Sequence, residues 1–443
     1  MSTVQSRAAV LPAVVVAYHG GADMLEVLRE RGIPFVRIQT DPDVSANRFM
    51  TRFLTDTPRD HEVLVYRGDV VRLANELRAL GVTHVIPADE AGVKLTDLLC
   101  DELGLPFNGM ARSAARRNKR LMHEAVAERG SRVPLQRLCG SPADVDAWME
   151  EHRLAFPVVV KPLDGAGSAG VTRCDSPDDV RQAFATIRQL ALHQGNVISV
   201  EDEVLAQELL RGTEYVVDTV SLGGRHKVTD IWKCVKGAHN GSAFVYEYFD
   251  LLPRDGATQD ALTAYVPGVL DALDISLGPG HAEVYFHDET GPVLVEVGSR
   301  IGGPRMPYPT AACTASGKSQ MEYTVDAYLE PERFHDRWDD GYDIVRQARM
   351  VFLISEREAL LDDFDAEVLD EIRSLPSYHA EEMALEPGER MVETVDVRSS
   401  PGCIFLIHES TEQLVRDYDA IRALEPRLYR AQAPTSTPAR PHA

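Results

Sequence analysis

The sequence has six cysteines among its 443 residues, and no two of them form a CxxC pair. Isolated cysteines do not make a disulfide framework or a cysteine-based zinc site, and they are typical of reduced thiols in the cytosol. Positive charge is also scarce, because 46 Lys and Arg stand against 69 Asp and Glu and give a net charge of −23. Nucleic acids and anionic membranes repel such a surface, so we expect neither as a partner.

An apolar run long enough to cross a membrane is absent as well. The longest run near the start, Ala8 to Tyr18, is shorter than the roughly 20 residues that a membrane-spanning helix needs. We interpret it as a buried strand and expect a soluble, cytoplasmic protein. Lysine is rare too: only seven of the basic residues are lysines, which makes the position of each one informative.

The order of strands and helices indicates the fold class. In the first third, apolar strands alternate with amphipathic helices, which is typical of parallel βαβ units. The turn after the first strand, AYHGGADM, is not the GxGxxG fingerprint, so a dinucleotide-dependent dehydrogenase is disfavoured. A charged helix over residues 112–130 leads to strand-rich α+β sections. We predict an α/β and α+β multidomain protein with units at 1–112, 113–330 (first lobe about 134–212) and 331–430, and a disordered tail at 431–443.

A glycine-rich loop follows a buried strand at residues 156–171, FPVVVKPLDGAGSAGV. The strand ends at Lys161, and the small residues of the loop are Gly165, Gly167, Ser168 and Gly170. Closely spaced glycines can turn successive backbone N–H groups toward a phosphate, and the lysine adds a positive charge. The lysine precedes the glycines, so this is not a Walker P-loop, and a plain hairpin turn explains the stretch about as well.

A second segment, VLAQELLRGTEYVVDTV at 204–220, begins apolar, passes through Gln207 and Glu208, and resumes as a strand at Glu214. A short backbone segment between two lobes can read an adenine edge with its own N–H and C=O groups, and an acid after it can accept from ribose hydroxyls. Taken alone, the segment is better explained as a solvated acidic turn between strands.

The stretch EVYFHDETGPVLVEVGSR at 283–300 predicts an antiparallel hairpin. With the turn centred between Glu289 and Thr290, Glu283 lies directly opposite Glu296, where like charges are destabilising. Strand alternation predicts a polar face with both glutamates, continued by Arg300. That face also carries Tyr285, His287, Leu294 and Gly298. A bridging Mg²⁺ would turn the repulsion into coordination. The alternative is a surface hairpin, since repulsion between exposed charges costs only about 1 kcal/mol.

The ordered set of these motifs resembles the ATP-grasp superfamily over roughly residues 10–425. VTHVIPADEAGVKLTDLLCDELGLPFNG is similar to the end of the domain that precedes the ATP-grasp fold. GCIFLIHESTEQLVRDYDAIRAL is similar to the C-terminal segment of the L-amino acid ligases, which make dipeptides. The resemblance implies a Rossmann-like pre-ATP-grasp domain, an ATP-grasp fold and a C-terminal α+β extension.

The resemblance also implies a role for individual residues. The implied nucleotide-binding residues are Lys119, Lys161, Gly165, Gly167, Ser168, Gly170, Gln207, Glu208, Leu210, Glu214 and Leu294. The implied Mg²⁺ ligands are Glu283 and Glu296, with Mn²⁺ as the alternative metal, and the implied catalytic groups are Arg300, Lys161 and Lys233. Two positions depart from the family pattern: many members have Asn in place of Gly298 and Glu in place of Gln207.

The implied reaction is ATP-dependent joining of a carboxylate to an amine, through an acyl phosphate, with release of ADP and phosphate. The candidate substrate residues are Glu90, Tyr246, Glu247 and Arg305, and His281 is either a partner of Glu283 or a core histidine. Two alternatives remain, a purine-pathway or carboxylating ATP-grasp enzyme and a non-catalytic nucleotide-binding protein. The sequence has no biotinyl-type AMKM segment, which disfavours a carboxylating enzyme. A protein that only binds a nucleotide would not need both metal carboxylates and Arg300, so catalysis is favoured. Whether the chain forms a homodimer is left open.

Overall fold

The computed structural model describes residues 13–16, 21–40, 63–165, 167–193, 203–303 and 306–431. Arg305 and the tail after residue 431 lie outside the described residues. Within the described part of the chain, no helix is long and apolar enough to span a bilayer.

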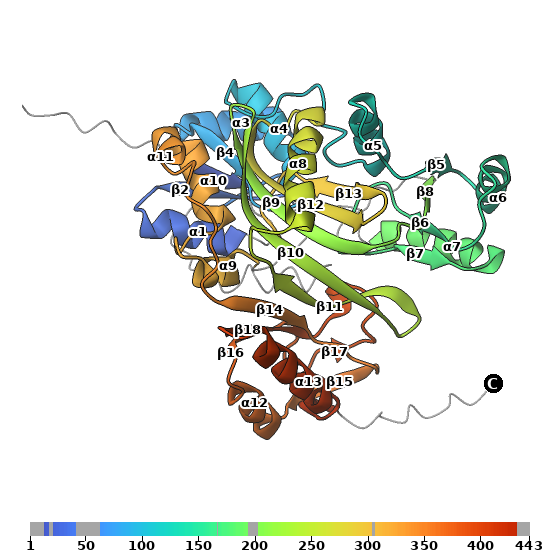
Figure 1. Cartoon of the computed structure of the whole chain (residues 1–443). Helices are drawn as coiled ribbons and strands as arrows, with labels where there is room; N and C mark the ends of the chain where they lie inside the picture. Colours follow the sequence, from blue (N-terminus) through green and yellow to red (C-terminus); the bar gives the residue numbers. More distant parts are fainter. Residues whose placement is uncertain are drawn as a thin grey trace, which may run out of the picture.

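The N-terminal unit is a parallel sheet, as the βαβ pattern predicts (Figure 1). Its strands run in the order β3-β2-β1-β4, and helices α1, α3 and α4 connect and flank them. The bounds are β1 Ala13–Val16, α1 Gly21–Glu30, β2 Phe35–Gln39, β3 Val63–Val65, α3 Val70–Ala79, β4 His84–Pro87 and α4 Gly92–Leu103. Parallel strands all end at one edge of their sheet, so β4 delivers the residues that follow it, including Glu90, to that edge.

The predicted helix at 112–130 is shorter than expected. Helix α5 spans Lys119–Glu128, and its first residue follows Asn118, whose extended backbone and side chain cap the helix by accepting from the Leu121 N–H. The residues before it form turns, because Arg116 is buried and its guanidinium bonds Asp97 and nearby carbonyls. The correction matters for function, since it places Lys119 at the start of a helix instead of in its middle.

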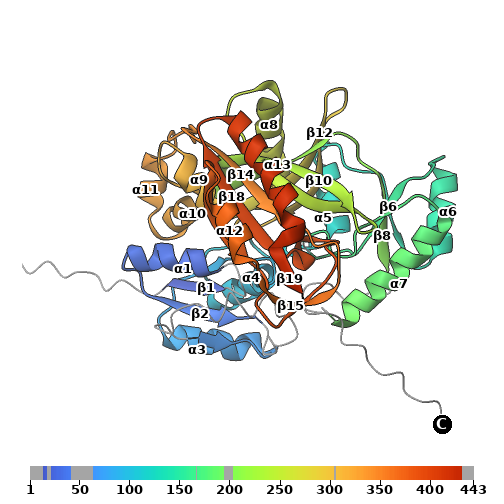
Figure 2. The ribbon, with the colours of Figure 1, turned by 90° about the horizontal axis from the view of Figure 1, so that it is seen from below.

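A second, antiparallel sheet forms the lobe that carries the glycine-rich loop. Its order is β5-β8-β6-β7, and helices α6 and α7 pack on it. The bounds are β5 Gln136–Cys139, α6 Pro142–Glu151, β6 Val158–Lys161, β7 Thr172–Cys174, α7 Pro177–His193 and β8 Val204–Glu208. In Figures 1 and 2 this lobe projects from one side of the molecule, and the glycine-rich loop joins β6 to β7.

An eight-stranded sheet forms the centre of the molecule, in the order β13-β12-β9-β10-β11-β14-β18-β16. The bounds are β9 Thr213–Leu222, β10 Arg225–His239, β11 Ser242–Leu251, α8 Ala257–Ala272, β12 Leu277–His287, β13 Gly291–Gly298, β14 Gln347–Phe352, β16 Tyr378–Met383 and β18 Gly402–His408. Helix α8 buries Leu262, Val266 and Leu270 against β9, β12 and β13. Of the strands after residue 331, β14, β16 and β18 thus extend the central sheet.

The remaining elements surround this sheet (Figure 2). A small sheet in the order β17-β15-β19 and helices α12 and α13 form the C-terminal cluster. The bounds are α9 Pro307–Cys313, α10 Gln320–Leu329, α11 Pro331–Asp336, β15 Ala359–Phe364, α12 Ala366–Arg373, β17 Arg390–Met391, η2 Val397–Ser399, α13 Thr411–Leu428 and β19 Tyr429–Ala431. The short helix η2 reaches back to the glycine-rich loop, because the Val397 N–H donates to the Gly167 carbonyl at 3.4 Å.

Candidate active site

The predicted hairpin is present as β12 and β13, and Glu283 is paired with Glu296 across it. Near the turn the pairing is shifted by one residue, because His287 pairs with Gly291 where the predicted register would pair it with Pro292. A β-bulge after Glu283 adds one residue to β13 and restores the predicted pairing. The opposition of the two glutamates is therefore confirmed, although the turn that was expected to produce it has a different register.

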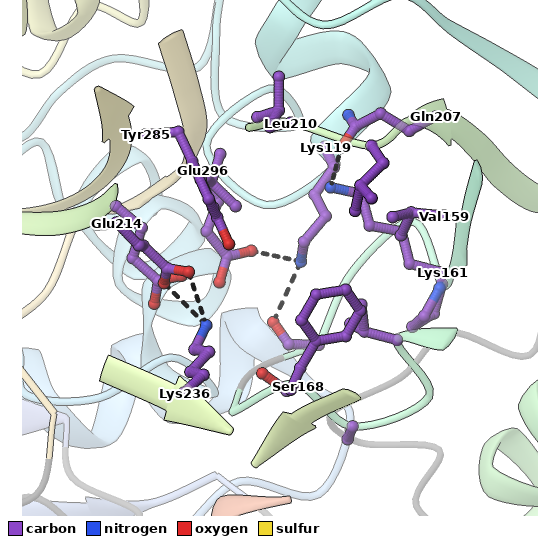
Figure 3. Close-up of a pocket in the computed structure, with 18 of the residues that line it drawn as sticks. Lys119, Val159, Lys161, Ser168, Gln207, Leu210, Glu214, Lys236, Tyr285 and Glu296 are labelled. Atoms are coloured by element: carbon purple, nitrogen blue, oxygen red, sulfur yellow. Dashed lines mark hydrogen bonds and ion pairs between the residues drawn. The ribbon is translucent and has the colours of Figure 1, made fainter. Parts of the chain in front are cut away.

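Both glutamates line one pocket, which lies between the central sheet and the glycine-rich lobe. Figure 3 shows this pocket with Glu296 labelled. Ten predicted site residues line it: Lys119, Lys161, Gly165, Ser168, Gln207, Glu208, Leu210, Glu214, Glu283 and Glu296. Segments far apart in the sequence supply these residues, namely the start of α5, the ends of β6 and β8, the glycine-rich loop between β6 and β7, the start of β9 and the hairpin. Gly167 and Gly170 also belong to the glycine-rich loop, and both have positive φ angles that favour glycine.

Leu294 is wrongly predicted as a nucleotide-site residue. The bulge shifts the alternation of β13 by one residue, so Leu294 pairs with Val284 and is fully buried in the core beneath α8. Val295 lines the pocket in its place, next to Glu296. A two-residue alternation cannot reveal a bulge, because the extra residue changes which side chains share a face.

Lys233 is also not among the residues that line the pocket; Lys236 is. Lys233 pairs with Tyr215, while its neighbour Cys234 pairs with Glu214, so Lys233 points to the other face of β10. Lys236 donates to both oxygens of Glu214, at 2.7 and 2.9 Å. Its position two residues after Cys234, on the face of Glu214, is the alternation signal that could have identified it.

Three predicted substrate residues, Glu90, Tyr246 and Glu247, are not among the residues that line the pocket, and neither is Arg300. Tyr246 is buried in an aromatic cluster with Phe249 and Phe352, and its ring faces the Lys236 ammonium at 4.4 Å. Glu247 points to the opposite face of β11 and accepts from His239 at 2.8 Å. Both residues lie within strand β11, which has a β-bulge between Tyr246 and Tyr248 where it pairs with β10. Phe244 of the same strand lines the pocket and was not predicted.

The environment moves the pKa values of the paired glutamates in opposite directions. Burial and the negative charges of Glu296 and Glu214 raise the pKa of Glu283 to about 8. Burial also raises the pKa of Glu296, but the ion pair with Lys119 and the nearby charges of Lys161 and Arg300 outweigh it and lower the pKa to about 2. Without a cation between them, one of the two carboxylates is readily ionised, and ionising the second is unfavourable.

The two lysines of the pocket are held differently. Lys119 pairs with Glu296 and donates to the Gly165 carbonyl at 3.4 Å, so it links the hairpin to the glycine-rich loop (Figure 3). Lys161 donates to Gln207 Oε1 at 2.9 Å. Burial and the charge of Lys119 lower the pKa of Lys161 to about 7, although Glu296 and Glu283 oppose the shift. An anion in the pocket would restore its positive charge.

Beside the hairpin, Glu90 joins two arginines. Its Oε1 accepts from Arg117, and its Oε2 accepts from Arg300 Nε at 2.9 Å. Although burial raises the pKa of Glu90, the two guanidinium charges hold it below its usual range. On the other side, His281 Nδ1 lies 2.7 Å from Asp218 Oδ1 and His281 Nε2 lies 3.8 Å from Glu283. His281 is therefore a neighbour of the glutamate and also a buried, bonded histidine.

The chain is similar to several known proteins. The ATP-grasp domain family matches residues 154–307. Dapdiamide A synthase from Enterobacter agglomerans is 31% identical over 423 residues, which cover 94% of this chain and 96% of that enzyme. Carnosine synthase 1 from Homo sapiens is 26% identical over 300 residues, covering 63% of this chain and 35% of the human protein. The solved structure of an L-amino acid ligase from Bacillus licheniformis has a TM-score of 0.74 at 20% identity and covers 95% of this chain and 99% of that one.

Proposed function

Since the chain belongs to the ATP-grasp amino acid ligases, we propose that its pocket binds ATP and a divalent cation beside Glu283 and Glu296. The chain is an ATP-dependent ligase that joins the carboxylate of an amino acid or related acid to an amine through an acyl phosphate. The observation that carries the pocket assignment is the meeting of Lys119 and Lys161 with the opposed glutamates in one cavity.

The adenine is best placed at the end of β8. Glu208 is fixed there, because its N–H donates to the Leu135 carbonyl and its carboxylate accepts from the Leu135 N–H, both at 2.9 Å. We therefore propose that the Glu208 carbonyl and the Leu210 N–H form the hydrogen bonds to the adenine edge. Gln207 supports Lys161 through its side-chain oxygen. Glu214, with its partner Lys236, is placed to accept from the ribose hydroxyls.

The hairpin fits a hard divalent cation. Within the described residues, no group of three or more His, Cys, Asp or Glu could hold a metal, so the ion would need ligands beyond the protein. Mg²⁺ is often held by one or two carboxylates together with substrate phosphates, and Mn²⁺ accepts similar oxygen ligands. Burial and the charge of Glu296 raise the pKa of Glu283, and this cost of a second negative charge is what a cation removes. Such an ion would supply charge stabilisation for the phosphoryl oxygens.

Other residues of the chain bind the phosphates and stabilise the reacting groups. Lys119 and Lys161 hold the phosphates and offset their charge, and the glycine-rich loop between β6 and β7 covers them. Arg300, two residues after β13, stabilises the carboxylate and phosphoryl oxygens as the acid attacks the γ-phosphate and ADP leaves, which gives the acyl phosphate. The amine then attacks the acyl phosphate, the C–N bond forms and phosphate leaves. Exclusion of water by the closed loop protects the acyl phosphate from hydrolysis.

The substrates are amino acids or related small acids and amines. The experiment that tests this is a matrix of amino acids and related carboxylic acids, offered in pairs with ATP and Mg²⁺. Phosphate release identifies the active pairs, and mass spectrometry identifies the amide. Release of phosphate without an amide, for every pair, would contradict the ligase function.

A further inference from the structure

We propose that Arg117 is a second substrate-binding arginine, which acts with Arg300 across the shared carboxylate of Glu90 to hold the carboxylate of the acid substrate. Arg117, Glu90 and Arg300 together form an arginine bridge. The inference rests on the ligase function proposed above. It also changes the role of Glu90, which becomes a positioning residue in place of a group that binds substrate directly.

The arginine bridge joins three separate parts of the fold. Glu90 follows β4 of the N-terminal sheet, Arg117 precedes α5, and Arg300 follows the metal hairpin. Only 14% of the Arg117 side chain, 17% of Glu90 and 11% of Arg300 are exposed. Both carboxylate oxygens of Glu90 accept a charge-assisted hydrogen bond, one from each guanidinium. Both oxygens of Glu90 are therefore engaged by the two arginines, and these bonds fix the orientation of the guanidinium groups.

Gly298 provides the space for this arrangement. A Cβ atom at position 298 would lie 2.8 Å from Glu90 Oε2 and 3.1 Å from Arg300 Nε. The first contact is shorter than real Cβ atoms show and the second is unusually tight, so a side chain here would shift the carboxylate or the guanidinium. The absence of a side chain at Gly298, where many members of the family have Asn, thus coincides with a carboxylate–arginine pair in the same place.

The position of the bridge indicates its ligand. Arg117 lies two residues before Lys119, and the charges of Glu90, Asp164 and Glu296 raise its pKa although burial lowers it. Glu283 and Glu296 also raise the pKa of Arg300, which burial lowers, so the bridge lies next to the metal hairpin. Both guanidinium groups stay charged among these carboxylates, and Arg300 is the group proposed above for the carboxylate of the acid. A planar guanidinium binds a carboxylate through paired N–H groups, so an acid substrate fits this position.

The test uses acyl hydroxamate formation. The full-length wild type receives ATP, Mg²⁺, an equimolar mixture of the proteinogenic L-amino acids and hydroxylamine, which displaces phosphate from the acyl phosphate and gives a hydroxamate. The acid that gives the most hydroxamate is then used alone. Arg117→Ala is expected to raise the KM for this acid about tenfold or more, because a charge-assisted hydrogen bond is lost. The KM for ATP should stay within about twofold, and Arg117→Lys should recover part of the acid affinity.

The matched control is Arg112→Ala. Arg112 is in the same segment but is 37% exposed and pairs with Glu128 at 2.6 Å, so its removal should leave both KM values unchanged. Calorimetric binding of ADP verifies that each variant keeps the nucleotide site. Loss of ADP binding in both Arg117 variants would contradict the proposal, because Arg117 would then maintain the fold.

Two further outcomes would overturn the bridge. One is an Arg117→Ala enzyme with the wild-type KM for the acid. The other is a Glu90→Gln enzyme that forms hydroxamate normally and has a raised KM only for the amine substrate, since Glu90 would then bind an ammonium group. If the wild type forms no hydroxamate from any acid, the ligase function itself is contradicted, and this result is distinct from both of the others.

Discussion

Glu283 and Glu296 are direct partners across the β12–β13 hairpin, yet the pocket raises the pKa of one and lowers that of the other. Burial is common to both, and the difference comes from neighbours. Lys119 forms an ion pair with Glu296, whereas Glu283 faces the negative charges of Glu296 and Glu214. A structural hairpin has no need of this arrangement, but a cation site that is completed by phosphate oxygens does.

The first prediction concerns the metal hairpin. Glu296→Gln keeps the size of the side chain but removes the charge, so ligase activity should fall about 100-fold or more while the fold is retained. Initial rates of phosphate release measure this, and circular dichroism verifies the fold. Glu289→Gln in the exposed turn of the same hairpin is the matched control and should have wild-type rates. Normal turnover in the Glu296 variant would refute the metal assignment.

The second prediction concerns Lys161. Burial and the charge of Lys119 lower its pKa to about 7, so above that pH the empty pocket holds a neutral amine. Bound phosphates favour the charged form, so nucleotide binding should take up a proton at about pH 8 and almost none at about pH 6. Affinity should accordingly be constant below pH 7 and fall as the pH rises through it.

Calorimetry in buffers of different ionisation enthalpy measures this uptake. Because Glu283 also titrates in this range, the relevant quantity is the difference between the wild type and Lys161→Met. A variant with the same proton uptake as the wild type at pH 8 would mean that another group is responsible.

The third prediction concerns the contact between η2 and the glycine-rich loop. Gly167 has a φ of 67°, and a Cβ atom there would lie 2.3 Å from Val397 Cγ1. Gly167→Ala should therefore push the loop away from η2 and raise the KM for ATP. Gly223→Ala is the matched control: its φ is 61°, and no atom lies within 4 Å of an added Cβ. Both variants should lose about 1 kcal/mol of stability from the backbone strain, but only the first should change the KM for ATP. Equal KM values would show that the contact with η2 has no role in nucleotide binding.

The fourth prediction separates Lys236 from Lys233. Lys236→Met leaves the buried Glu214 without its partner, so the KM for ATP should rise about tenfold. Lys233→Met should leave it within about twofold, because Lys233 is on the other face of β10. The opposite result would restore Lys233 as the functional lysine.

The sequence predicted those parts of the site that depend on local order along the chain. The parallel N-terminal sheet, the hairpin and its opposed glutamates follow from apolar patterning and turn residues, and all are present. The bulge was not predictable, and it exchanged Leu294 for Val295 in the pocket. The bonds of Glu90 were not predictable either. They join residues 27 and 210 positions apart, and only tertiary packing brings such residues together.

The central claim is that the chain forms an amide through an acyl phosphate, and the identity of the nucleotide product tests it most directly. With an active acid–amine pair, ATP and Mg²⁺, nucleotides and phosphate are quantified together with the amide by chromatography and mass spectrometry. The account predicts one ADP and one phosphate for each amide formed. Formation of AMP and pyrophosphate would contradict it, because the acid would then be activated by adenylation.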